Sequence, residues 1–156
     1  MFDSLFTKTR KLHFFLNTYL PFLGAGIRVE HISDDFLAID VRMPLYRGNK
    51  NYVGTHFGGS LYAMTDPFFM VMLMENLGKD YIVWDKAANI DFIAPGRETV
   101  KAHFRLSKEE IERVRVAAES GNAVYPEYPI EVLGEDGLVV ARVIKTLYVR
   151  KKKPKL

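Results

Sequence analysis

The chain has 156 residues, 48% hydrophobic and 26% charged, which is enough to bury one sizeable core and is typical of a single globular domain. Its formal net charge is +3, but five of the basic residues lie at the end of the chain, namely Arg150, Lys151, Lys152, Lys153 and Lys155. The remainder carries slightly more acidic than basic residues, which excludes a basic platform for nucleic acid, and the absence of cysteine excludes disulfides and thiolate nucleophiles.

The first 22 residues predict an amphipathic helix that stops before Pro21, because hydrophobic residues recur there at near-helical spacing: Phe2, Leu5, Phe6, Leu12, Phe15, Leu16 and Tyr19. Basic residues precede part of this segment, but no small-residue cleavage site of a signal peptide follows. We therefore expect a cytoplasmic protein. Residues 67–74 form the longest apolar run, far short of the roughly 20 residues that span a bilayer, so no stable membrane insertion is expected.

Residues 24–29 and 36–43 read as two strands, with a turn signal at Asp34-Asp35 between them. Residues 58–77 are apolar on nearly every side, which predicts a long buried helix. Residues 81–94 and 100–106 follow as further strands.

The segment Ser107-Lys-Glu-Glu110 has the spacing of a capping box, which predicts a surface helix to about Ser120. Residues 123–133 and 138–149 form a closing pair of strands around the hairpin signal Asp136-Gly137. Strands grouped after a central helix predict an α+β fold, in which an antiparallel sheet wraps around that helix.

The stretch Asn51-Tyr-Val-Gly-Thr-His-Phe-Gly-Gly-Ser-Leu-Tyr-Ala-Met-Thr-Asp66 is the most informative part of the sequence. Between His56 and Glu75 the only ionisable side chains are Tyr62 and Asp66. A carboxylate in an apolar run costs free energy unless it finds partners. Asp66 is therefore either the cap of a helix that starts at Pro67 or a catalytic group.

This pattern resembles the hot-dog fold and, more narrowly, the phenylacetyl-CoA thioesterase-like branch of the acyl-CoA thioesterases. That branch carries Asn, Gly-Thr and His-Gly-Gly, with an acid eight residues after the first glycine of the pair. Asn51, Gly54-Thr55, Gly58 and Asp66 keep this spacing. The segment Asn89-Ile-Asp-Phe-Ile-Ala-Pro95 is similar to the family strand at the dimer edge. His56 departs from the pattern, because Phe57 separates it from the glycines.

The resemblance implies a hot-dog domain over residues 23–150, preceded by an N-terminal helix at 1–22 and followed by a basic tail at 151–156. The helix from Ser107 is an insertion relative to that branch. We read the tail as a disordered, solubilising segment, with the phosphates of CoA or an anionic membrane surface as alternative contacts.

The resemblance also implies an enzyme that hydrolyses an acyl-CoA or acyl-carrier thioester, in a site shared between the subunits of a homodimer or homotetramer. The amide of Gly58 or Gly59 would contact the thioester oxygen, and Asp66 would act as general base or nucleophile. Asn51 would position water or the thioester, and His56 would orient either.

On the following strand, Asp85, Lys86 and Asn89 are candidates for substrate binding, although the two charges also fit an ion pair within the sheet or across a dimer. Where this sequence has Asp85, the family often has a small hydroxyl residue.

Two other functions remain open at this point. The first is a 3-hydroxyacyl dehydratase on the same fold, with His56 as its base. The second is an acyl-ligand binding protein without catalysis. The sequence has no P-loop, no G-x-G-x-x-G and no metal-ligand spacing, so we expect neither a cofactor nor a metal.

Overall fold

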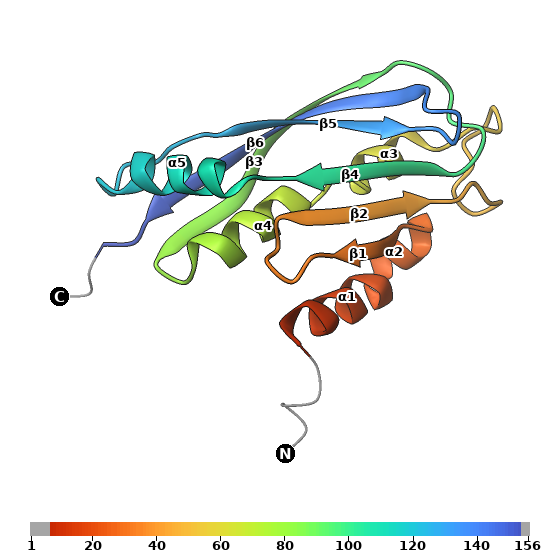
Figure 1. Cartoon of the computed structure of the whole chain (residues 1–156). Helices are drawn as coiled ribbons and strands as arrows, with labels where there is room; N and C mark the ends of the chain where they lie inside the picture. Colours follow the sequence, from red (N-terminus) through yellow and green to blue (C-terminus); the bar gives the residue numbers. More distant parts are fainter. Residues whose placement is uncertain (1–6, 154–156) are drawn as a thin grey trace.

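The computed structural model describes residues 7–153 and contains one six-stranded antiparallel sheet that curves around a helix (Figure 1). The strands lie in the order β1-β2-β4-β5-β6-β3, and their bounds are β1 Arg28–Ile32, β2 Ala38–Met43, β3 Tyr81–Phe92, β4 Val100–Arg105, β5 Glu127–Leu133 and β6 Val139–Lys151. The helices are α1 Lys8–Thr18, α2 Leu20–Ala25, α3 Gly58–Ala63, α4 Phe68–Leu77 and α5 Lys108–Ala118. This arrangement is the predicted α+β, hot-dog fold. Within residues 7–153, no helix combines the length and hydrophobicity needed to cross a bilayer.

The N-terminal segment forms two helices in place of the single one predicted. Pro21 lies in the first turn of α2, where its missing N–H group leaves no hydrogen bond unmade. Gly26, with φ of 77°, ends α2, so the strand predicted from residue 24 begins only at Arg28. Phe2, Leu5 and Phe6 of the predicted helix lie outside the described residues.

The central helix predicted over residues 58–77 is interrupted. Helix α3 ends at Ala63 and α4 begins at Phe68, after a cis peptide bond between Asp66 and Pro67. Asp66 does not cap α4: Pro67 occupies the N-cap position and no side chain there bonds to the helix amides. The cap interpretation of Asp66 is therefore wrong, and its carboxyl group has a different partner.

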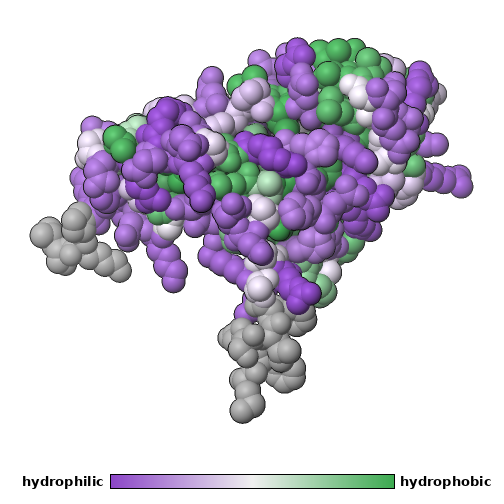
Figure 2. All heavy atoms as spheres, in the orientation of Figure 1, coloured by the Kyte–Doolittle hydropathy of each residue, from purple (hydrophilic) through white to green (hydrophobic). Residues whose placement is uncertain are grey.

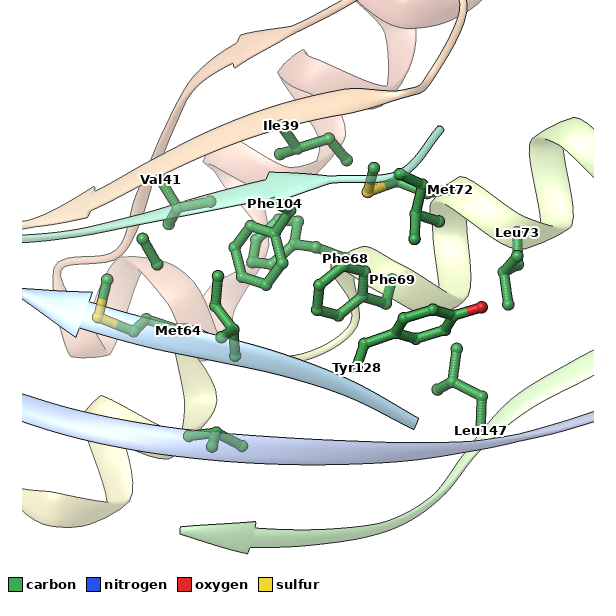
Figure 3. Close-up of a cluster of buried hydrophobic side chains, with 14 of the residues drawn as sticks. Ile39, Val41, Met64, Phe68, Phe69, Met72, Leu73, Phe104, Tyr128 and Leu147 are labelled. Atoms are coloured by element: carbon green, nitrogen blue, oxygen red, sulfur yellow. The ribbon is translucent and has the colours of Figure 1, made fainter. Parts of the chain in front are cut away.

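Helix α4 and the sheet enclose the core. Figure 3 shows the rings of Phe68 and Phe69 projecting from α4 toward Phe104 on β4 and Tyr128 on β5. The ring centroids of Phe68 and Phe104 are 4.8 Å apart, and those of Phe69 and Tyr128 are 4.9 Å apart. Such aromatic pairs contribute about 0.5–1.5 kcal/mol each beyond the burial of their area. This packing fixes α4 against the concave face of the sheet.

Helix α5 forms as predicted. Ser107 Oγ accepts a hydrogen bond from the Glu110 amide at 3.1 Å, and Glu109 and Glu110 lie in the first turn, where negative charge is favourable. At the other end of the chain, β6 continues to Lys151, and the Lys152 amide donates to the Asp80 carbonyl. The first part of the basic tail is thus paired structure, and Lys155 lies outside the described residues.

Strand β3 is an edge of the sheet. It pairs with β6 alone among the described strands, and it contains one extra residue, Lys86, between Asp85 and Ala87. Near its C-terminal end Phe92 is 57% exposed and Ile93 is 53% exposed. In Figure 2 hydrophobic residues gather at the top of the molecule, over the end of β3 seen in Figure 1, while most of the remaining visible surface is hydrophilic.

Candidate active site

The loop before α3 is shaped by the side chain of Asn51. Its Nδ2 donates to Thr55 Oγ1 at 2.8 Å and to the His56 carbonyl at 3.2 Å. Its Oδ1 accepts from the amides of Val53 and Thr55 at 3.1 and 3.0 Å. These four bonds use both donors and the acceptor oxygen of the amide. Asn51 therefore holds the loop that leads into the glycine pair.

His56 is buried beside this loop as a neutral ring. Its Nε2 lies 2.8 Å from the Glu98 carbonyl and carries the proton, because a carbonyl oxygen can only accept. Its Nδ1 is buried and has no hydrogen-bond partner among the described residues. Burial lowers the pKa of His56, and the hydrogen bond to Glu98 opposes this only in part. At neutral pH the ring thus offers one free acceptor nitrogen.

The glycine pair lies at the start of α3, under two phenyl rings. A Cβ atom would lie 3.0 Å from the Phe92 ring at Gly58 and 2.4 Å from the Phe57 ring at Gly59. Neither glycine has a positive φ, so lack of space is the reason for glycine here. The first amides of a helix have no partner within it, and those of Gly58 and Gly59 donate to no other residue in the described part of the chain.

A pocket of about 270 Å³ opens beside the glycine pair, and its wall includes Asn51, His56, Gly58 and Phe92. The structure thus brings together three of the residues that the sequence singled out. Asp66 does not line this pocket within one copy of the chain.

Asp66 lies in a second cluster, on the break between α3 and α4. Its Oδ1 accepts a hydrogen bond from Lys145 Nζ at 3.0 Å. The same Nζ lies 3.0 Å from Asp85 Oδ1, without the alignment of a hydrogen bond, and 5.2 Å from the centre of the Tyr62 ring. The Lys145 side chain is 1% exposed, Asp85 is 19% exposed and Asp66 is 43% exposed. One buried ammonium group therefore joins two carboxyl groups.

The two carboxyl groups differ in their proton affinity. Burial and the neighbouring Asp66 raise the pKa of Asp85 to about 7, although Lys145 opposes them. For Asp66, burial favours a higher pKa, but interactions with Asp85 and Lys145 outweigh it and hold the pKa below its usual value. Burial likewise acts against the charge on Lys145, but both carboxyl groups raise its pKa. At neutral pH Asp66 is an ionised, partly exposed carboxylate.

The other two residues predicted on β3 lie apart from this cluster. Lys86 is exposed, and its Nζ lies 4.1 Å from the centre of the Tyr125 ring. Asn89 is also exposed, whereas its neighbours Ala88 and Ile90 pack against the core. Of the three residues predicted to bind substrate, only Asp85 is thus brought to Asp66.

Lys145 is the residue of this cluster that the sequence reading missed. It lies on β6 in alternation with Val143, Leu147 and Val149, all of which are buried. A lysine in step with inward-facing residues of a strand is a signal of a buried charge. That signal was present in the sequence. A buried ammonium group requires a partner of opposite charge.

A family model described as a domain of unknown function, DUF4442, matches residues 8–149 of the chain. Comparison with curated proteins found no match.

Solved structures share the fold at low sequence identity. A Pseudomonas aeruginosa protein of unknown function, called a probable thioesterase, is 20% identical, with 90% of this chain and 95% of that chain covered and a TM-score of 0.78. A Chlorobaculum tepidum protein of unknown function is also 20% identical, with 92% and 94% covered and a TM-score of 0.70. A Haemophilus influenzae thioesterase is 18% identical, with 92% and 90% covered and a TM-score of 0.66. These likenesses confirm the hot-dog fold.

Proposed function

The chain belongs to the family described as DUF4442, a domain of unknown function, and we propose that it hydrolyses an acyl thioester of CoA or of an acyl carrier. The observation that carries this proposal is the Asp66 carboxylate. It is partly exposed, and Lys145 Nζ donates a hydrogen bond to its Oδ1 at 3.0 Å. Its spacing from the two amides of Gly58 and Gly59 is that of the thioesterases this sequence resembles. The thioesterase names of two structural neighbours agree with the proposal.

Hydrolysis needs a polarised carbonyl group and a nucleophile. In the proposed mechanism the amide of Gly58 or Gly59 donates to the thioester oxygen and stabilises the negative charge that develops on it. Asp66 either removes a proton from an attacking water or attacks the carbonyl carbon itself. In the first route the C–S bond breaks, the thiolate leaves and takes up the proton, and the acyl group departs as a carboxylic acid. In the second route the thiolate leaves while the acyl group stays on Asp66 as an anhydride, and a water then hydrolyses the anhydride, which frees the carboxylic acid and restores Asp66. Asn51 acts indirectly, by holding the loop before the glycines.

We propose that the complete site forms between two copies of the chain, because the glycine pocket and Asp66 are separate within one copy. Strand β3 offers the means: its free edge can pair with a second β3. With antiparallel pairing about a two-fold axis at Asn89, Phe92 would lie opposite the partner's Lys86, next to the partner's Asp85. The Phe92 ring covers Gly58, so this pairing would bring the glycine amides of one copy near the second carboxyl cluster. A homodimer, or a homotetramer built from it, would result.

The main test measures free thiol released from a panel of acyl-CoA substrates that differ in chain length and aromaticity. Asp66→Asn should lower kcat by a factor on the order of 100 to 10,000, the usual contribution of a general base. Asp80→Asn, at an exposed turn, serves as the control and should keep full activity. Full activity in Asp66→Asn would remove Asp66 from the chemistry, and a wild-type protein inactive on the whole panel would refute the thioesterase function.

A shared site has its own test, which mixes two inactive variants. Asp66→Asn lacks the carboxylate, and the added side chain of Gly58→Val blocks access to the amides of the glycine pair. After joint unfolding and refolding, the mixture should regain about a quarter of wild-type activity, because half of the dimers are mixed and each holds one intact site of two. If the mixture stays as inactive as its components, each site lies within one copy of the chain.

One observation favours a second candidate, the 3-hydroxyacyl dehydratase. His56 Nδ1 is a buried acceptor without a partner, as a base would be before substrate binds. Among the described residues, however, no acidic side chain lines the pocket beside it. Hydration of an enoyl-CoA that is lost in His56→Ala would support the dehydratase. Tight acyl-CoA binding without turnover of either substrate type would instead indicate the acyl-binding protein.

A further inference from the structure

The buried Lys145 is unexpected in a hydrophobic core. Its side chain is 1% exposed and lies on β6 between the buried residues Val143 and Leu147. Moving an ammonium group from water into such a place costs several kcal/mol, and an apolar residue of similar volume often stabilises a core equally well. Core stability therefore gives no reason for a lysine at this position, and its two carboxylate partners become the relevant feature.

The two partners come from different elements of the fold. Asp85 belongs to β3, the strand paired with β6, and lies one residue before the extra residue Lys86. Bulges of this kind redirect side chains and are frequent next to active sites. Asp66 belongs to the break between α3 and α4. Lys145 therefore connects the sheet to the segment that carries the proposed catalytic carboxylate.

The contacts also differ between the partners. Lys145 donates an aligned hydrogen bond to Asp66, which keeps 43% exposure, whereas both oxygens of the less exposed Asp85 are buried and accept no hydrogen bond. A proton on Asp85 lowers the cost of burying these oxygens, which have only the misaligned Lys145 ammonium group beside them. The charged groups facing Asp85 are Lys145 and Asp66, and Tyr62 lies across from Lys145. At neutral pH the cluster therefore holds one ammonium group, one accessible carboxylate and one partly protonated carboxyl group.

We propose that Lys145 is a positioning residue for Asp66: its ammonium group keeps Asp66 ionised and directed away from the core, and Asp85 holds the ammonium group from the sheet side. This inference rests on the proposed thioesterase function, in which Asp66 must accept a proton or attack as a carboxylate. Without the ammonium group, two neighbouring carboxyl groups would share one proton, and Asp66 would be protonated in part of the molecules near neutral pH.

The absence of cysteine from the chain permits a test in which only the charge is changed. Lys145→Cys is alkylated in denaturant and then refolded. A 2-aminoethyl reagent restores a lysine-like ammonium group on a thioether, whereas a propyl reagent gives a side chain of nearly the same size without charge. The pKa of Asp66 is measured in both proteins from the carboxyl ¹³C shift, and kcat/KM is measured against pH.

The propyl protein should show an Asp66 pKa about 1 to 3 pH units above that of the aminoethyl protein, the usual effect of an adjacent charge. The acid limb of its kcat/KM profile should move upward by the same amount. A purely structural lysine would lower thermal stability without moving either quantity. Equal Asp66 pKa values in the two proteins would overturn the proposal.

A second variant protects the test against failure to refold. Asp85→Leu removes the carboxyl group that holds the ammonium group and, together with Lys145, keeps the pKa of Asp66 low, so the pKa of Asp66 and the acid limb should both move upward. Lack of movement here would likewise contradict the proposal. The proposed function and the positioning role of Lys145 can fail separately. If Lys145 changes the pKa of Asp66 in a protein without thioesterase activity, only the proposed function is refuted. Activity with a pH profile independent of Lys145 refutes the positioning role alone.

Discussion

Replacing Asp85 by asparagine should change how the stability of the protein depends on pH. The carboxyl group of Asp85 has a pKa of about 7 in the folded protein and 3.8 as its ordinary value. Between these values the folded protein binds a proton that the unfolded chain has released. The free energy of unfolding therefore falls as pH rises from 3.8 to about 7, and this contribution is constant at higher pH.

The magnitude follows from the difference in proton affinity. A tenfold difference corresponds to about 1.4 kcal/mol, so the part of this change above pH 5 amounts to about 3 kcal/mol for a fully buried group. Asp85 is 19% exposed, and solvent screens part of the effect, so we expect about 2 kcal/mol. That is a measurable fraction of the roughly 5–15 kcal/mol that stabilises a typical domain.

The assay is urea unfolding at pH 5 and pH 8 for wild type, Asp85→Asn and the exposed control Asp80→Asn. Other titrating groups, such as His56, contribute equally to all three proteins. Wild type and control should each lose about 2 kcal/mol more than Asp85→Asn between the two pH values. Parallel curves for wild type and Asp85→Asn would refute the reasoning, because they would show that Asp85 is ionised at pH 5 in the folded protein.

Substitutions at three further positions test the fold and the glycine pair. Gly59→Ala should lower kcat with little change in thermal stability, because the new methyl group must displace the exposed Phe57 ring and nothing in the backbone forbids it; steady-state kinetics beside a melting curve checks this. Phe68→Ala should destabilise the protein by about 3–5 kcal/mol in urea unfolding, the usual effect of emptying a fully buried ring site. Ser107→Ala should lose about 1 kcal/mol by the same measurement, since it removes the cap of α5, and Ser107→Asp should retain the cap.

The fold could be predicted from the sequence because most of its signals are local. Hydrophobic periodicity marked the strands and helices, and the four residues Ser107 to Glu110 were enough to place a helix start that the structure confirms. The spacing of Asn51, Gly58 and Asp66 added the family resemblance. That spacing is a distance along the chain, however, and the structure places Gly58 and Asp66 in separate clusters.

The sequence left the interruption of the central helix as one of two alternatives, because the residues on both sides of it are apolar. Hydrophobicity alone does not distinguish one buried helix from two, and Pro67 was the only local sign of a break. Lys145 was missed altogether. A single lysine in a strand reads as exposed unless its alternation with Val143, Leu147 and Val149 is followed along the chain.

The single extra residue in β3, Lys86, changes which of the following side chains face the core. Tyr81, Val83 and Asp85 face the helix side before it, and Ala88 and Ile90 pack against the core after it. An uninterrupted strand would turn Asn89 and Asp91 toward the core and send Ile90 into solvent. Deleting Lys86 removes the extra residue itself and should leave Asp85, Ala88 and Ile90 on one face. Inserting a residue between Ala88 and Asn89 should be far more damaging, because it would turn Ile90 and the Phe92 ring to the opposite face.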